Sequence, residues 1–328
     1  MRGHKLLILG VALLVVSGAG ALPLVTSSSF SDQTVNNGSL ISAVPDWVAP
    51  TVPAAAIGKT AGGTTGFIRA NGTYYIYANA TDTGAPASGI ATVRANVNNV
   101  TTGQTAVTLV AGTYTAGGVS YQYRSPQLTA RAGLPTGALA FSITATDNAA
   151  GATTTGFSVT GDNTAPSASA VQAANVGGGT LGRLGLGDTL TLTYSEVMDS
   201  DSILAGWNGS QTNVILVLVN GGTASDYIQV YSPAQVVMPL GTVTLNRTDF
   251  IAGATGNYVT FGLTGTPSAM TASGAAISFV LGTASGAVTT AAGTGTMSWT
   301  PSATATDRAG NPSTTTVRTE SGTSDRDF

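Results

Sequence analysis

The sequence predicts an all-β protein made of two tandem β-sandwiches, the second enlarged by an insertion. Two phrases occur twice: Ala-Thr-Asp at residues 145–147 and 305–307, and Asp-x-x-Ala-Pro at residues 46–50 and 162–166. Short apolar runs alternate with a period of two, and Gly, Ser, Thr and Asn separate them. Repetition of this kind is typical of modular β proteins.

The N-terminal residues 1–21 have the composition of a secretory signal peptide. Arg2, His4 and Lys5 form a positively charged start. An apolar stretch follows, and Ala-Gly-Ala at residues 19–21 fits a cleavage site. The apolar stretch has about 11 residues, whereas a membrane-spanning helix needs ~20. We therefore expect a secreted, extracellular or cell-surface protein that keeps no transmembrane segment after cleavage.

The composition excludes several classes of function. Cleavage would remove Arg2 and Lys5, leaving ten of the 12 basic residues against 15 acidic ones, a net charge of −5. The cleaved chain would contain no Cys and no His, because His4 is the one histidine of the sequence. Catalytic triads, thiolate or imidazole zinc sites and disulfides are thereby excluded. Nucleic-acid binding lacks the basic patch that it requires. We predict a protein that is not an enzyme.

The first sandwich is predicted over residues 46–160. Alternation puts one row of side chains on the inner face of a strand, namely Tyr74, Ile76, Ala78 and Ala80. A second inward row leads directly to Asp147 and consists of Leu139, Phe141, Ile143 and Ala145. About seven short strands over roughly 110 residues fit a two-sheet sandwich of the immunoglobulin-like type.

The second sandwich is predicted over residues 161–318, followed by a polar tail at 319–328. Leu190, Leu192 and Tyr194 alternate toward its interior. Residues 214–219 are apolar on both faces, which indicates a central strand that is covered on both sides. This module is longer than the first, and we predict that the extra length is an insertion near residues 200–254.

Three segments of each module carry a resemblance to a known family. These segments are residues 46–50, 80–93, 145–149, 162–166, 187–199 and 305–311. In them the two modules resemble bacterial Ig-like domains of secreted and cell-surface proteins. The resemblance implies a structural, adhesive or spacer role outside the cell, with components of the cell envelope or extracellular matrix as partners.

Residues 22–45 are predicted to form a polar stalk or linker. Within them, Phe30-Ser31-Asp32 and Asn-Gly-Ser-Leu at residues 37–40 resemble the N-terminal region of camelysin/TasA-type secreted fibre proteins. This resemblance implies an alternative function, a fibre-forming matrix subunit. In that case the stalk would add as a strand to another copy of the chain.

Three aspartates form a candidate calcium site. We expect Asp82, Asp147 and Asp162 near one pole of the first sandwich, where their carboxylates would supply part of the six to eight oxygen ligands that Ca²⁺ takes. The alternative is that Asp147 and Asp307 close turns at strand ends and that the protein takes no cofactor. The sequence lacks a dense Asp-x-Asp-x-Asp run, which favours the turn interpretation.

Tyrosines suggest a second kind of ligand, a glycan. An aromatic platform for a carbohydrate would be built in the first module from Tyr74, Tyr75, Tyr77, Tyr121 and Tyr123. Tyrosines that alternate along strands also commonly pack one row into the core, so the sequence leaves both interpretations open.

The acidic group Glu196, Asp199 and Asp201 is the one candidate for carboxylate catalysis. A glycosidase needs two carboxyl groups that flank a sugar, one of them with a raised pKa. Here the three acids follow an alternating strand, which predicts a solvated loop and ordinary pKa values. This pattern favours a surface turn over an active site.

Overall fold

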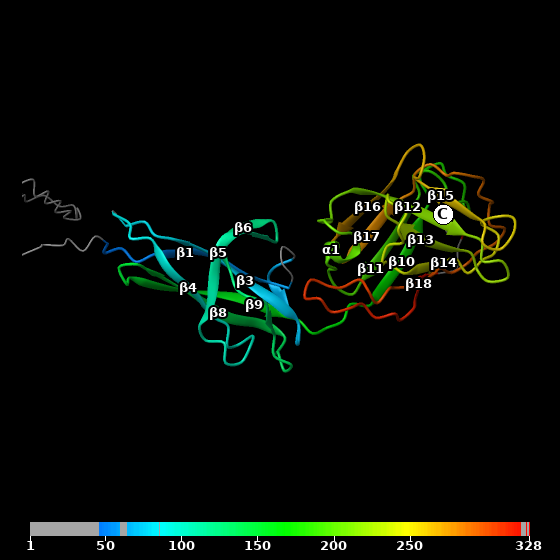
Figure 1. Ribbon diagram of the computed structural model, residues 1–328. Coiled ribbons are helices and arrows are strands. Elements are labelled where there is room, and N and C mark those ends of the chain that lie inside the picture. The colour runs from blue at the N-terminus through cyan, green and yellow to red at the C-terminus, as the bar shows by residue number, and fades with distance from the viewer. Residues whose placement is uncertain (1–45, 60–63, 85, 323–325, 327) are drawn as a thin grey trace, which may run out of the picture. The chain divides into compact units, whose positions relative to one another are not determined.

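The described part of the chain folds almost entirely into β-strands, which confirms the predicted all-β class (Figure 1). The computed structural model describes residues 46–59, 64–84, 86–322, 326 and 328. The predicted signal peptide and polar stalk lie outside the described residues. Among the residues described, no helix is long and apolar enough to cross a membrane.

The first module forms one nine-stranded sheet. Its strands are β1 (Thr51–Gly58), β2 (Phe67–Ile68), β3 (Thr73–Thr81), β4 (Ile90–Asn96), β5 (Val107–Ala116), β6 (Val119–Arg124), β7 (Leu128–Thr129), β8 (Gly137–Asp147) and β9 (Ala152–Gly161). The order is β1-β3-β6-β5-β4-β8-β9-β2, and β7 pairs with β3. Two of these strands, β2 and β7, have two residues each, so the seven longer strands agree with the number expected from the sequence.

Strand β5 belongs to both layers of the first module. Its first residues pair with β4, where Leu109 lies opposite Val93, and its later residues pair with β6. The core lies between the layers and contains both predicted inward rows, with Ile76 and Ile143 fully buried. Alternation in the sequence therefore predicted these strand faces correctly.

The second module forms a ten-stranded sheet. Its strands are β10 (Ala168–Ala174), β11 (Thr189–Tyr194), β12 (Thr212–Val219), β13 (Tyr227–Tyr231), β14 (Thr242–Thr244), β15 (Tyr258–Phe261), β16 (Ser268–Ser273), β17 (Ala276–Val280), β18 (Ser298–Thr300) and β19 (Arg318–Thr319). A short helix, α1 (Ser200–Ile203), follows β11. The order is β10-β11-β17-β16-β12-β13-β14-β18-β19, and β15 also pairs with β12.

Strand β12 is the central strand that the apolar residues 214–219 predict. It pairs with β16 through its first residues and with β13 and β15 through the rest. Leu216 and Leu218 point into the core, and Ile215 on the opposite face is also buried, although that face lines a surface pocket and is therefore only partly covered. The predicted insertion, residues 200–254, contains α1 and β12 to β14, so it forms the centre of this sheet.

The second core is built around Trp299, which is fully buried. Its ring meets the Tyr194 ring edge to face, with centroids 4.8 Å apart. Its indole Nε1 donates a 2.8 Å hydrogen bond to the carbonyl of Leu240, so its polar atom is paired inside the core.

Candidate functional site: two carboxylate clusters

Three aspartates from separate strand ends meet in the first module. Asp46 precedes β1, Asp82 follows β3, and Asp147 is the last residue of β8. One carboxylate oxygen from each lies within 4.8 Å of the other two. We call this group the first carboxylate cluster. It forms because antiparallel neighbours β4 and β8, together with β1 and β3, bring these ends of the strands to one pole of the sheet.

A matching group belongs to the second module. Asp162 follows β9, Glu196 comes two residues after β11, and Asp307 lies opposite Met198 in an isolated bridge. Their carboxylate oxygens also lie within 4.8 Å of one another. We call this group the second carboxylate cluster.

The structure divides the predicted calcium ligands between these two clusters. Asp82 and Asp147 lie together as expected, whereas Asp162 belongs to the second cluster. Asp46, Glu196 and Asp307 were missed as members. The repeated phrases contain the missing signal, because they align Asp46 with Asp162 and Asp147 with Asp307.

Backbone amides surround the first carboxylate cluster. Asp46 accepts hydrogen bonds of 2.9 Å from the N–H groups of Val48 and Ser88. These two amides lower the pKa of Asp46, because they stabilise its ionised form. Asp82 accepts a 2.6 Å hydrogen bond from the N–H of Gly89. The negative charge of this cluster is therefore partly balanced by the protein itself.

Two glycines leave room for the carboxylates of the first cluster. A Cβ at Gly84 would lie 2.2 Å from Oδ1 of Asp46, and a Cβ at Gly151 would lie 2.5 Å from Oδ2 of Asp147. Both distances are shorter than any van der Waals contact. The close approach of backbone and carboxylate therefore requires glycine at these two positions.

The closing aspartates also form the predicted turns. Asp147 Oδ1 accepts hydrogen bonds from the N–H groups of Ala149 (2.9 Å) and Gly151 (2.7 Å). Asp307 Oδ1 accepts them from Gly310 (2.7 Å) and Asn311 (2.8 Å). The turn interpretation of Asp147 and Asp307 is confirmed. It coexists with cluster membership, since each carboxylate does both.

Glu196 lies in the loop after β11, as predicted, but it is half-buried, so the predictions of a solvated position and an ordinary pKa were wrong. Its Oε1 is buried and has no hydrogen-bond partner among the described residues. Burial, followed by the negative charges of Asp307 and Asp162, raises the pKa of Glu196 to about 7. Its carboxylate lies beside that of Asp162, which follows β9 and is remote from Glu196 in the sequence. Asp199 and Asp201 are not members of this cluster.

The tyrosines of the first module do not form an open platform. Tyr74 and Tyr77 are fully buried, and Tyr121 packs against Tyr77 with ring centroids 5.5 Å apart. The guanidinium of Arg124 covers the ring of Tyr75 at 4.8 Å from its centroid. These rings therefore stabilise the module through packing and cation–π contacts.

Comparisons with protein-family models, with curated proteins and with solved structures find no match to this chain.

Proposed function

We propose that this chain is a secreted or cell-surface structural and adhesive protein that presents two Ig-like modules and performs no catalysis. The observation that carries the proposal is the repetition of one plan in both modules. Each has a sheet in which one strand pairs with both layers. Three acids meet at strand ends of the first module, and three acids meet around the linker residue Asp162 at the start of the second. Repeated modules of this kind suit spacing and presentation better than a single deep active site.

The chemistry of the clusters supports a non-catalytic role. In a glycosidase the two carboxyl groups stand about 5 to 9.5 Å apart, because a sugar or a water must fit between them. Here turn amides donate hydrogen bonds to carboxylate oxygens of both clusters. Oxygens that are held as acceptors in turns do not suit the roles of nucleophile or general acid.

Fractionation of the native host tests the location. We expect the full chain in the medium or at the cell surface, where added protease degrades it on intact cells. A variant that lacks residues 1–21 should stay inside the cell. Recovery of the full chain mainly from the cytoplasm would contradict the proposal.

A second candidate function is the binding of a divalent cation, and the unpaired Oε1 of Glu196 favours it. Three carboxylates that meet within 4.8 Å repel one another. The positive charge of Arg308 offsets part of this repulsion, and a proton on Glu196 or a bound cation would relieve the rest. Oxygen ligands of this kind select a hard cation such as Ca²⁺. A cation in the second carboxylate cluster would join the linker residue Asp162 to the second module.

Calorimetric titration with Ca²⁺ tests this candidate. We expect one dominant site, whose affinity falls about ten-fold or more in Glu196→Gln because that variant loses a charged ligand. The matched variant Asp82→Asn, in the first cluster, should leave that site unchanged. Equal binding by the unaltered chain and Glu196→Gln would remove the second cluster as a cation site.

A further inference from the structure

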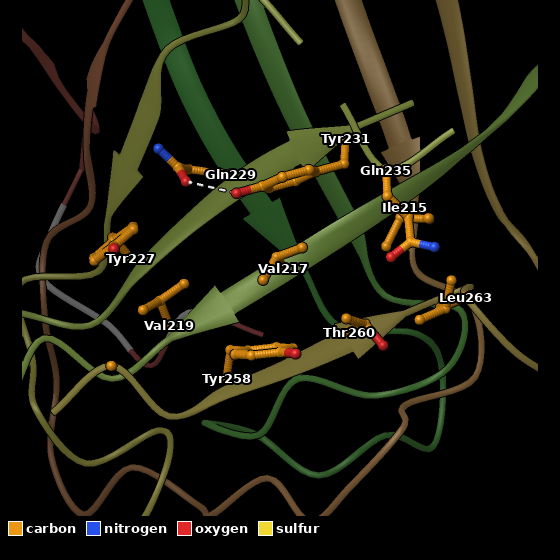
Figure 2. A pocket seen from close by; sticks show the side chains of 11 residues that line it. Ile215, Val217, Val219, Tyr227, Gln229, Tyr231, Gln235, Tyr258, Thr260 and Leu263 are labelled. Atoms are coloured by element: carbon orange, nitrogen blue, oxygen red, sulfur yellow. Dashed lines mark hydrogen bonds between the residues drawn. The ribbon is translucent and has the colours of Figure 1, made fainter. Parts of the chain in front are cut away.

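The outer face of the second sheet carries a pocket lined by three tyrosines (Figure 2). It lies over β12, with β13 on one side and β15 on the other. The register arranges the side chains in three rows: Tyr231 with Ile215, Gln229 with Val217 and Thr260, and Tyr227 with Val219 and Tyr258. The volume is about 350 Å³, within the usual range for small-ligand pockets. We call it the tyrosine pocket.

One polar group in the tyrosine pocket lacks a partner. Thr260 is only 6% exposed, and its hydroxyl makes no hydrogen bond within the described part of the chain. A buried hydroxyl without a partner costs about 1 to 3 kcal/mol, so such groups in native proteins usually meet a ligand or a water. On the same strand, β15, Tyr258 is 66% exposed, which is unusual for a large aromatic side chain that serves only the core.

Amide groups complete the polar lining of the tyrosine pocket. Gln229 lies opposite Val217, and its Oε1 accepts a hydrogen bond from the hydroxyl of Tyr231 at 3.3 Å, a long distance for such a bond (Figure 2). Gln235 lies at the rim in a backbone conformation with φ of 60°, which is uncommon for residues other than Gly, Asn and Asp. A ligand with hydroxyl groups can therefore exchange hydrogen bonds with amides and hydroxyls on several sides.

None of the described residues that line the tyrosine pocket is charged. Aromatic faces attract an apolar surface, whereas the row between them presents an amide and an unpaired hydroxyl. A purely apolar ligand would leave Thr260 unpaired, and a charged ligand would find no opposite charge. The combination fits a ring with an apolar C–H face and hydroxyl groups around its edge.

We propose that the tyrosine pocket binds a neutral sugar ring, as part of a neutral glycan. This assignment rests on the proposed adhesive function, to which it adds the class of ligand. The sequence predicted an aromatic platform for a carbohydrate in the first module, whereas the tyrosine pocket lies in the second. Tyr258 stacks on the sugar, and Thr260 with Gln229 binds its hydroxyl groups.

The test is calorimetric titration of the full chain with neutral oligosaccharides of glucose, galactose, mannose and N-acetylglucosamine. We expect binding of at least one of them. Tyr258→Ala should weaken it about ten-fold through loss of stacking. Thr260→Val should weaken it about five-fold through loss of one hydrogen bond. It should not lower thermal stability, because it removes an unpaired hydroxyl and keeps the shape.

Trp47→Ala provides the control, since Trp47 is 88% exposed and lies in the first module. It should leave sugar binding unchanged. The proposal is overturned if no oligosaccharide binds, or if Tyr258→Ala binds as well as the unaltered chain. It is also overturned if the chain self-associates and Tyr258→Ala abolishes this, because a second copy then occupies the pocket. Fractionation of the host reports on location separately, so the two proposals can fail independently.

Discussion

The two carboxylate clusters share their opening and closing aspartates but balance their negative charge in different ways. In the first cluster, amide hydrogen bonds stabilise the ionised form of Asp46 and lower its pKa. In the second, the middle acid Glu196 has a buried oxygen without a partner and a pKa raised to about 7. The comparison shows that a repeated motif fixes the turns, while the non-repeated acid between the motifs differs in its hydrogen bonding. The pKa shifts of Asp46 and Glu196 have opposite directions.

The largest expected effect on stability comes from removing the closing aspartate of either cluster, Asp147 or Asp307. Asp147→Ala and Asp307→Ala should each lower the free energy of unfolding by about 2 to 4 kcal/mol, because each removes the carboxylate oxygen that accepts hydrogen bonds from two turn N–H groups. Urea denaturation measures both. Asp201→Ala is the control, since exposed Asp201 accepts one amide hydrogen bond, from Gly206, and its loss should cost less than about 1 kcal/mol. An unchanged midpoint for Asp307→Ala would show that the two turns are not equivalent.

The next effect is the pH dependence of folding stability, which should differ between the two clusters. The folded pKa of Glu196 lies above its ordinary value of 4.5, so its favourable contribution is complete below about pH 4.5. That contribution is lost as the pH rises to about 7. Without divalent cations, stability should therefore fall by roughly 2 kcal/mol across this interval. Thermal melting at a series of pH values, in the presence of a chelator, measures this loss of stability.

The substitution Glu196→Gln should abolish this pH-dependent fall, since the amide does not ionise. The first cluster has the opposite sign: the pKa of Asp46 is lowered, so its contribution is present above pH 3.8 and is lost as the pH falls further. An identical pH profile for the unaltered chain and Glu196→Gln would argue against the charge repulsion described for the second cluster.

The smallest effect tests the turns themselves. The first turn has Gly151 where the second has Asn311, whose side-chain amide donates to Oδ2 of Asp307 (2.8 Å) and to the carbonyl of Asp162 (3.0 Å). Asn311→Gly should cost about 1 kcal/mol, because both hydrogen bonds are lost. Chemical denaturation resolves a change of this size. A cost as large as that of Asp307→Ala would mean that Asn311 contributes far more than these two bonds.

Much of the fold was predictable because strand alternation is local. The period of two in the sequence placed Ile76 and Ile143 in the core. The run of apolar residues on both faces identified β12 as a central strand. The members of the two carboxylate clusters were harder to predict from the sequence. Asp46 and Asp82 are far apart in sequence, and only the pairing of β1 with β3 brings them together. The tyrosine pocket depends in the same way on the register between β12, β13 and β15.

The parallel pairing at the end of the first module has a mechanical consequence. Strand β2 runs parallel to β9, and the backbone N–H groups of Thr160 and Asp162 donate to the carbonyls of Gly66 and Ile68, both at 2.9 Å. Asn163 adds a 2.7 Å bond from the N–H of Ala70. A force on the linker pulls the C-terminal end of β9 along the direction of the strand, relative to β2. The load is then a shear shared by these bonds at once, so the module resists extension at the point where the linker leaves it.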